Sequence, residues 1–293
     1  MAGWSDYSNQ NVANYMAGSL AMPALPSLWL ALFTAAFTSN AGTGGTEATG
    51  NAYARQQIAG PLTANAVTTA SAVLHFASVP TWIVPGMLCR DVTTPANVPT
   101  GTTVVSTVPG ASGTVTISNT VTTTATEVFT FSAFAAATAS VGSEPAAQPG
   151  GILSNANITF VQATGTGWGT IVSFAAYDAV TSGNMIWWDF LGTFKWLPFT
   201  GSSASPSVLT SPAHGYSNGD QVAVTTKYGG TLPATAGSWA FPLTVASVAT
   251  DTFTAGVNTT TTGDGLVRKV ATQPIAGNVT ASFASGQLTL TDA

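Results

Sequence analysis

The chain has 293 residues, and only 6% of them are Asp, Glu, Lys or Arg, where a soluble globular domain usually has about a quarter. The formal net charge is −5, and Arg268-Lys269 is the only adjacent basic pair, so we expect no nucleic-acid partner. No apolar run approaches the ~18 residues of a membrane span, so we expect no membrane partner either. A surface rich in Thr, Ser, Asn and Gly suits permanent packing inside an assembly.

The first predicted element is a short helix over residues 9–17. Asp6 or Ser8 is expected to cap it, and Gly18 is placed to end it. The apolar side chains that this helix would bury are Val12, Tyr15 and Met16.

The next segments predict β-structure. The apolar run 28–34 is typical of a central strand, residues 39–50 of a loop, and the alternating run 52–58 of a strand exposed on one face. Runs typical of further strands follow, and they include 113–119, 128–132, 184–190, 221–226, 243–248 and 252–255.

From residue 73 the texture changes to short Val-, Thr- and Ile-rich runs between Pro and Gly, which is typical of a small all-β unit. The predicted fold class is therefore mainly β: a discontinuous, β-sandwich-like base domain with one short N-terminal helix and two small inserted β domains. We expect the inserts to span 73–147 and 201–270. The base segments are 1–72, 150–200 and 271–293.

The chain offers little for catalysis or metal binding. His75 and His214 are the only histidines, and neither lies near a nucleophile elbow or forms a zinc-binding pair. Cys89, the single cysteine, is expected to be a small buried hydrophobe. The runs 218–220 and 263–265 are read as ordinary turns rather than calcium loops. We therefore expect no cofactor and no metal site.

Asp178 and Asp189 are the candidate carboxylate pair for a polysaccharide-cleaving site. Asp178 and Asp189 flank a turn and a strand that ends in Trp187-Trp188-Asp189. However, an Asp before a turn commonly accepts backbone hydrogen bonds, which is the role expected of Asp178. Neighbouring tryptophans on a strand must point to opposite faces, so at least one of Trp187 and Trp188 is expected in the core. The prediction is that the chain is not an enzyme.

Aromatic residues are the remaining candidates for binding. Trp82, Trp196 and Trp239 lie beside Pro or Ser near the expected module edges, where they would act as interface anchors, as sugar platforms, or as plugs of small β cores. Trp4 and Tyr7 are expected to form a tether, because they lie outside the alternating β pattern.

Three groups of motifs occur in a fixed order along the chain. The first group consists of Leu30-Ala31-Leu32-Phe33-Thr34, Gly44-Gly45-Thr46-Glu47 and Tyr53-Ala54-Arg55-Gln56. The second group consists of the run 153–160 and Gly167-Trp168-Gly169-Thr170. The third group consists of Tyr177-Asp178-Ala179 and Gly183-Asn184-Met185. In this order they resemble a family of small tailed-bacteriophage structural proteins commonly labelled tail-fibre proteins. The closing run 286–292 resembles that family as well.

The resemblance implies a virion structural protein. The run 73–147 resembles a module found in many virion proteins, and 201–270 is similar to small β modules of phage tail and fibre proteins. In the second module the resemblance implies that His214 shapes a turn by hydrogen bonding the backbone.

The expected function is that of an accessory protein on the particle surface, first of all a capsid decoration or cement protein that stabilises the head. This preference rests on the lack of long coiled-coil or triple-β repeats typical of a fibre shaft. The alternatives are a tail or tail-fibre component and a module that binds a host-surface glycan as receptor. Expected partners are the major capsid protein or tail proteins, further copies of the chain, and, in the last alternative, the glycan. Without a signal-peptide pattern, we expect assembly into virions in the host bacterial cytoplasm.

Overall fold

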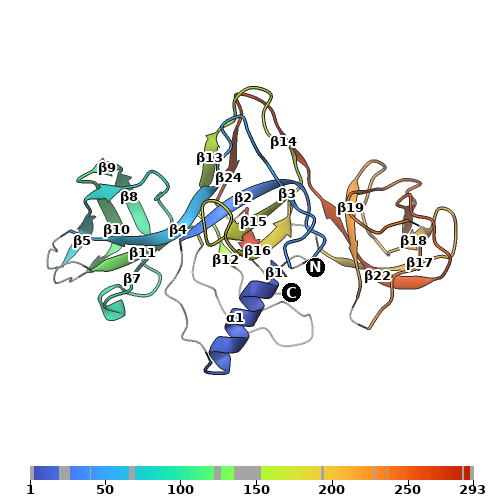
Figure 1. Ribbon diagram of the computed structural model, residues 1–293, viewed down its shortest axis with the longest axis horizontal. Coiled ribbons are helices and arrows are strands. Elements are labelled where there is room, and N and C mark those ends of the chain that lie inside the picture. The colour runs from blue at the N-terminus through green and yellow to red at the C-terminus, as the bar shows by residue number, and fades with distance from the viewer. Residues whose placement is uncertain are drawn as a thin grey trace.

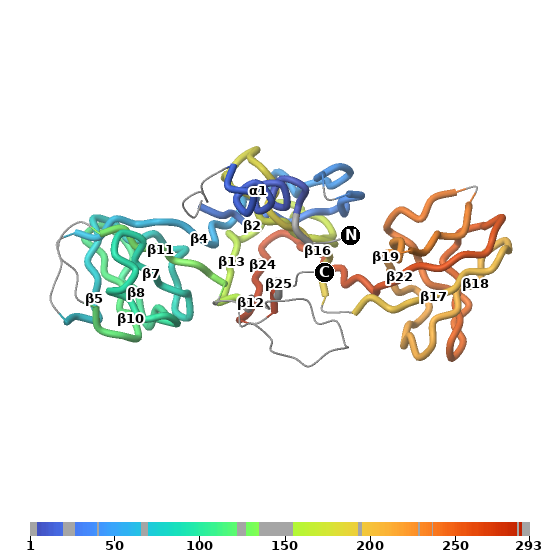
Figure 2. The backbone as a smooth tube through the Cα atoms, turned by 90° about the horizontal axis from the view of Figure 1, so that it is seen from below, coloured from blue at the N-terminus to red at the C-terminus, as the bar shows by residue number. Residues whose placement is uncertain are grey.

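The computed structural model describes residues 3–19, 27–39, 41–65, 70–121, 127–134, 153–192, 195–227, 229–235, 237–285 and 287–290. Three bodies lie in a row: a first lobe (70–134), a central base (3–65, 153–192 and 271–290) and a second lobe (195–270) (Figures 1 and 2). The described chain is mainly β, with one α-helix and one short 3-10 helix, so the predicted fold class is confirmed. Among these residues no helix is long and apolar enough to cross a membrane.

Helix α1 (Asp6–Met16) starts earlier than predicted, and its first turn is anchored to the base. Ser5, not Asp6 or Ser8, is the N-cap, and its hydroxyl oxygen accepts a hydrogen bond from the Ser8 amide. The hydroxyls of Ser5 and Ser8 donate to the carbonyls of Met185 and Ile186, which fixes the first turn to the base. The rest of α1 projects away (Figure 1).

The expected burial of the apolar helix residues is wrong for this reason. Val12, Tyr15 and Met16 are 44%, 46% and 80% exposed, because the base sheet ends beside the first turn of α1.

One eight-stranded antiparallel sheet runs from the base into the first lobe. Its order is β1-β16-β15-β2-β4-β11-β7, with β3 paired to β2. These strands are β1 (Gly3–Trp4), β2 (Leu28–Ala35), β3 (Thr46–Glu47), β4 (Gln56–Thr63), β7 (Leu88–Asp91), β11 (Val128–Ser132), β15 (Ser173–Tyr177) and β16 (Met185–Phe190). One end of β4 pairs with β2 and the other with β11, so a continuous backbone ladder joins the two bodies.

Two details of this sheet differ from the sequence prediction. The strand expected over 52–58 begins only at Gln56, because Asn51 and Ala52 form a turn with φ of 49° and 65°. The predicted loop 39–50 contains the short strand β3.

The first lobe closes over an aromatic core. Strands β5 (Ser71–His75), β10 (Thr114–Val121) and β8 (Val104–Val108) form a sheet, and β6 (Ser78–Val79), β9 (Gly110–Ala111) and the 3-10 helix η1 (Pro95–Asn97) complete the lobe. The Phe76 ring packs edge-on against Phe129 and Phe131 at centroid distances of 6.3 and 5.8 Å. Cys89 is buried as expected, and this burial raises the pKa of its thiol to about 12. His75 lies on the exposed face of β5.

The second lobe is a six-stranded sheet of order β20-β19-β22-β17-β18-β21. Its strands are β17 (Leu197–Gly201), β18 (Val208–Thr210), β19 (Gln221–Thr225), β20 (Leu243–Thr244), β21 (Thr252–Thr254) and β22 (Gly263–Val270). His214 packs on Phe253, and its Nδ1 accepts a hydrogen bond from the Tyr216 amide at 2.9 Å, in the turn role that the resemblance implied.

The turn predicted over 263–265 is wrong, because these residues begin strand β22. A Cβ on Gly263 would lie 2.4 Å from the Thr231 carbonyl oxygen. The glycine therefore serves close packing between two backbone segments rather than a turn.

The C-terminal segment returns to the base through three two-stranded pairings. β12 (Leu153–Ser154) pairs with β25 (Thr289–Leu290), β13 (Ile158–Gln162) with β24 (Thr280–Phe283), and β14 (Gly169–Ile171) with β23 (Gln273–Ile275). The β13, β14 and β24 segments form an arch above the base sheet (Figure 1). Gly286, Thr291 and Asp292 of the closing motif lie outside the described residues.

The first and third motif groups meet at a buried arginine. Arg55 donates from Nε and Nη2 to the two carboxylate oxygens of Glu47 at 2.9 and 2.7 Å. Its Nη1 donates to the carbonyl oxygens of Ala179 and Ser182 at 3.0 and 2.7 Å. Its guanidinium carbon lies 3.8 Å from the centroid of the Tyr177 ring. We call this group the Arg55 clamp.

Tyr53 supports the clamp from the side. Its hydroxyl donates to Glu47 Oε1 at 3.1 Å and accepts from the Leu32 amide at 2.9 Å. Burial lowers the pKa of Arg55, but the hydrogen bonds and charge of Glu47 outweigh it, so the pKa is raised overall. The clamp thus stays charged while it ties β3, the start of β4 and the β15–β16 turn together.

Replacing the clamp arginine with lysine should destabilise the fold. In Arg55→Lys the ammonium cannot span the Glu47 carboxylate and both carbonyls, so we expect the free energy of unfolding to fall by about 2–4 kcal/mol. Chemical denaturation followed by circular dichroism measures this. The matched control is Arg90→Lys, at an exposed position in β7. Equal stabilities of the two variants would contradict the role of the clamp.

Candidate functional site

The two carboxylates considered for sugar cleavage are not brought together. Both oxygens of Asp178 accept hydrogen bonds from Asn184, at 2.6 and 2.8 Å, as expected for an Asp before a turn. In the β15–β16 ladder Asp189 lies opposite Phe174. Phe174 precedes Asp178 by four residues, so the backbone positions of the two aspartates are separated by about 13 Å along the strand. Glycosidase carboxylates lie closer than that. The expectation that the chain is not an enzyme stays a prediction.

No group of three or more His, Cys, Asp or Glu side chains that could hold a metal ion occurs among the described residues. The neighbouring tryptophans of β16 point to opposite faces, as predicted, and both are buried. Trp187 packs on Phe174 and Trp188 on Phe37, each at a centroid distance of 5.1 Å. These two indoles therefore belong to the core on either side of the base sheet.

Of the five candidate binding residues, Trp4 and Tyr7 lie at the start of the base, and Trp82 lies in the first lobe. Trp4 is in β1, where its backbone pairs with Trp187, and its side chain is outside the described part of the structure. Tyr7 is 42% exposed in the first turn of α1. Trp82 is half-buried in a turn of the first lobe, against the hydrophobic core.

Trp196 and Trp239, by contrast, line one cleft between the base and the second lobe, although 43 positions separate them. The cleft has a volume of about 390 Å³. We call it the joint cleft. Its lining residues are Ala36, Phe37, Thr38, Trp188, Phe190, Trp196, Ala223, Val224, Thr225, Ser238, Trp239, Ala240 and Phe241.

An ion pair beside this cleft fixes the second lobe to the base. Arg268 of β22 donates from Nη1 to Asp189 Oδ1 of β16 at 2.7 Å, and the two side chains are 7% and 18% exposed. Its Nη2 donates to the Gly192 carbonyl at 2.8 Å, and its guanidinium carbon lies 5.9 Å from the ring centroids of both Phe190 and Trp196. The described residues of the second lobe share no sheet with the base, so side-chain contacts carry this joint.

Burial raises the pKa of Asp189, while the charge of Arg268 and the hydrogen bonds from Arg268 and the Phe190 amide lower it less. Keeping this carboxylate ionised in the native protein thus costs free energy of desolvation, and Arg268 compensates only part of that cost.

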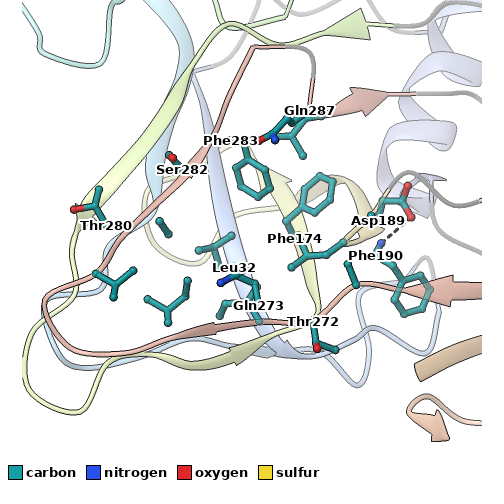
Figure 3. Close-up of a pocket in the computed structure, with 18 residues that line it drawn as sticks. Leu32, Phe174, Asp189, Phe190, Thr272, Gln273, Thr280, Ser282, Phe283 and Gln287 are labelled. Atoms are coloured by element: carbon teal, nitrogen blue, oxygen red, sulfur yellow. Dashed lines mark hydrogen bonds between the residues drawn. The ribbon is translucent and has the colours of Figure 1, made fainter. Parts of the chain in front are cut away.

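A second, larger cavity lies on the other side of Phe190. It has a volume of about 630 Å³, is open on one side, and is lined mainly by residues of β15, β16, β23 and β24 (Figure 3). The rings of Phe174 and Phe283 lie side by side on its wall, with centroids 5.6 Å apart, and Ser282 and Gln287 add polar groups. Asp189 is the one charged residue among those lining it, and Arg268 engages that carboxylate.

Removing the two partners of the joint ion pair should have unequal effects. Arg268→Ala leaves a buried carboxylate without its cation, so we expect a loss of about 3–5 kcal/mol in unfolding free energy. Asp189→Asn leaves the arginine with the Gly192 carbonyl and should cost about 1 kcal/mol or less. The control is Lys227→Ala, which removes a surface pair to Asp264 at 3.9 Å. Denaturant titration compares the three variants. A larger loss for Asp189→Asn than for Arg268→Ala would refute this ranking.

The raised pKa of Asp189 predicts a pH dependence of stability. The native protein takes up a proton at Asp189 at a higher pH than the unfolded chain does, so this group adds stability as the pH falls through the raised pKa. Asp189→Asn lacks the group. The melting temperature of the wild type minus that of Asp189→Asn should therefore become more positive as the pH falls from about 7 to about 4. Paired thermal melts measure this difference, and a constant or opposite trend would count against the buried charge.

Comparison with known families identifies the chain's relatives. A family model described as "Podophage GP4 fiber I protein gp80" matches residues 3–84 and 84–198, which span about two thirds of the 293 residues. The match includes the expected insert 73–147, which contains most of the first lobe. It ends at residue 198, before the main part of the second lobe. No curated protein and no solved structure matches the chain. The chain therefore belongs to the family of the podophage GP4 fiber I protein gp80, which makes it a bacteriophage virion component of the tail-fibre type.

Proposed function

We propose that this protein is a structural component of a podophage tail fibre and not a capsid decoration or cement protein. The observation that carries the proposal is the family match, which covers α1, most of the base and the first lobe. The match favours the tail-fibre alternative of the sequence analysis and gives no support to its first choice, the capsid exterior. The chain lacks the repeats of a fibre shaft, but this lack concerns only the fold of the chain itself. It does not favour a place on the capsid over a place in the fibre.

The exposed apolar side chains of α1 support attachment to other virion proteins. Tyr7, Val12, Tyr15 and Met16 expose apolar surface on a helix whose only charged residue is Asp6. Side chains of this kind leave water when a helix packs on a protein partner, and the partner needs no opposite charge. In the proposed fibre, α1 contacts a tail protein or a further copy of the chain.

The base supports a permanent load-bearing role. It is cross-tied by the Arg55 clamp, and the first lobe continues its main sheet through β4 and β11. A force on that lobe would be carried by backbone hydrogen bonds over several strands rather than by a flexible linker. We propose no catalytic activity for this arrangement.

Labelling of intact particles tests the proposed location. Gold-conjugated antibodies raised against the isolated full chain should decorate the tail and its fibres in negatively stained virions, with few grains on the shell. An antibody against the major capsid protein is the matched control and should give the reverse pattern. Grains spread evenly over the shell would overturn the fibre proposal and restore the capsid alternative.

A further inference from the structure

We infer that the joint cleft is a binding site for a neutral saccharide. The inference is that the isolated chain binds such a saccharide in this cleft. The further step, that the saccharide belongs to the host surface, rests on the proposed fibre function. The starting point of the inference is the meeting of Trp196 and Trp239, which lie 43 positions apart in the sequence of the second lobe, beside Phe241 and the Phe37 end of the base sheet.

The aromatic rings of the cleft offer fixed, partly open faces. Trp239 is half-buried, and its indole N–H donates to the Pro233 carbonyl at 2.9 Å, which holds the ring in place. Trp196 is half-buried as well, and its ring packs edge-on against Phe190 at a centroid distance of 6.5 Å. Rings held in this way lose little conformational freedom when a ligand stacks on them.

Hydrogen-bonding groups stand among these rings. The Trp196 indole N–H and the Thr225 hydroxyl have no hydrogen-bond partner among the described residues. The Ser238 hydroxyl oxygen accepts from the Ala240 amide, which leaves its own O–H free to donate. The residues that line the cleft thus carry both donors and acceptors that a ligand can use.

Charge decides which polar ligand fits. None of the residues that line the cleft is charged, and the nearest guanidinium, that of Arg268, is already paired with Asp189. An acidic or basic ligand would lose its hydration without gaining a counter-charge, which is costly.

An apolar ligand is disfavoured for a different reason. It would exclude water from the Trp196 N–H and the Thr225 hydroxyl without replacing those hydrogen bonds, at about 1–3 kcal/mol for each group. A neutral sugar ring avoids both penalties, because its C–H face stacks on an indole while its hydroxyl groups bond the polar edge. The volume of about 390 Å³ lies in the range of small-molecule sites.

The test uses the purified full chain and soluble oligosaccharides. Neutral gluco-, galacto-, manno- and rhamno-oligosaccharides, each up to about 10 mM, are compared with sialylated and uronic-acid oligosaccharides. Binding is read by tryptophan fluorescence and by saturation-transfer NMR. We expect at least one neutral oligosaccharide to bind and the acidic ones to bind more weakly or not at all. Absence of binding by every neutral member, or a preference for acidic ones, would overturn the inference.

Conservative variants place the site without unfolding the lobe. Trp196→Phe keeps a ring but removes the N–H, and Thr225→Val keeps the shape but removes the hydroxyl, so each should weaken binding by about three- to tenfold while the chain stays folded, as checked by circular dichroism. The control is Ser282→Ala in the larger cavity, which should bind as the wild type does. Wild-type binding by both cleft variants, or a loss confined to Ser282→Ala, would refute the site. Binding is measured on the isolated chain, away from the particle. A lack of saccharide binding would therefore not contradict the fibre location, and gold labelling of the shell would not contradict the saccharide site.

Discussion

The guanidinium group of Arg55 holds together segments that are far apart in the sequence. It joins the Glu47 carboxylate on β3 to the turn between β15 and β16, and its flat face covers Tyr177. Since β3 pairs with β2, and β15 pairs with both β2 and β16, this one side chain links three neighbouring parts of the base sheet. In a chain with 6% charged residues, such buried pairing is where charge has its largest structural effect.

The two lobes are attached to this base in physically different ways. The first lobe shares the base sheet, so its position follows from strand register. The second lobe has its own sheet and depends on Arg268, Asp189 and the aromatic residues around Phe190. The joint cleft lies where the base and the second lobe meet through side chains rather than through a shared sheet.

Local patterns predicted the elements whose burial depends on their immediate neighbours. The runs that became β2, β10, β11 and β16 follow the alternation or the apolar content of their own residues. Strand β22 was missed, because its glycines, Asp264 and Arg268-Lys269 are typical of a surface turn when read alone. The exposure of α1 could not be read from its apolar residues either, since it depends on where the base sheet ends.

The candidate site shows the same limit. Composition near the module edges pointed to Trp196 and Trp239, but their meeting depends on how β17 and the loop before β20 fold back on the base. Arg268 was noted only as part of a basic pair, and its partner lies 79 positions away, a separation that no local pattern reports. The motif groups, in contrast, did identify the clamp residues, although their contacts became visible only in the fold.

The central claim is that this chain is a tail-fibre component of the particle. The most direct measurement is its copy number relative to the major capsid protein, obtained by quantitative mass spectrometry of purified virions with isotope-labelled standards. A fibre on a symmetric tail predicts on the order of ten copies per particle. A count on the order of hundreds, matched to the number of capsid subunits, would contradict the account.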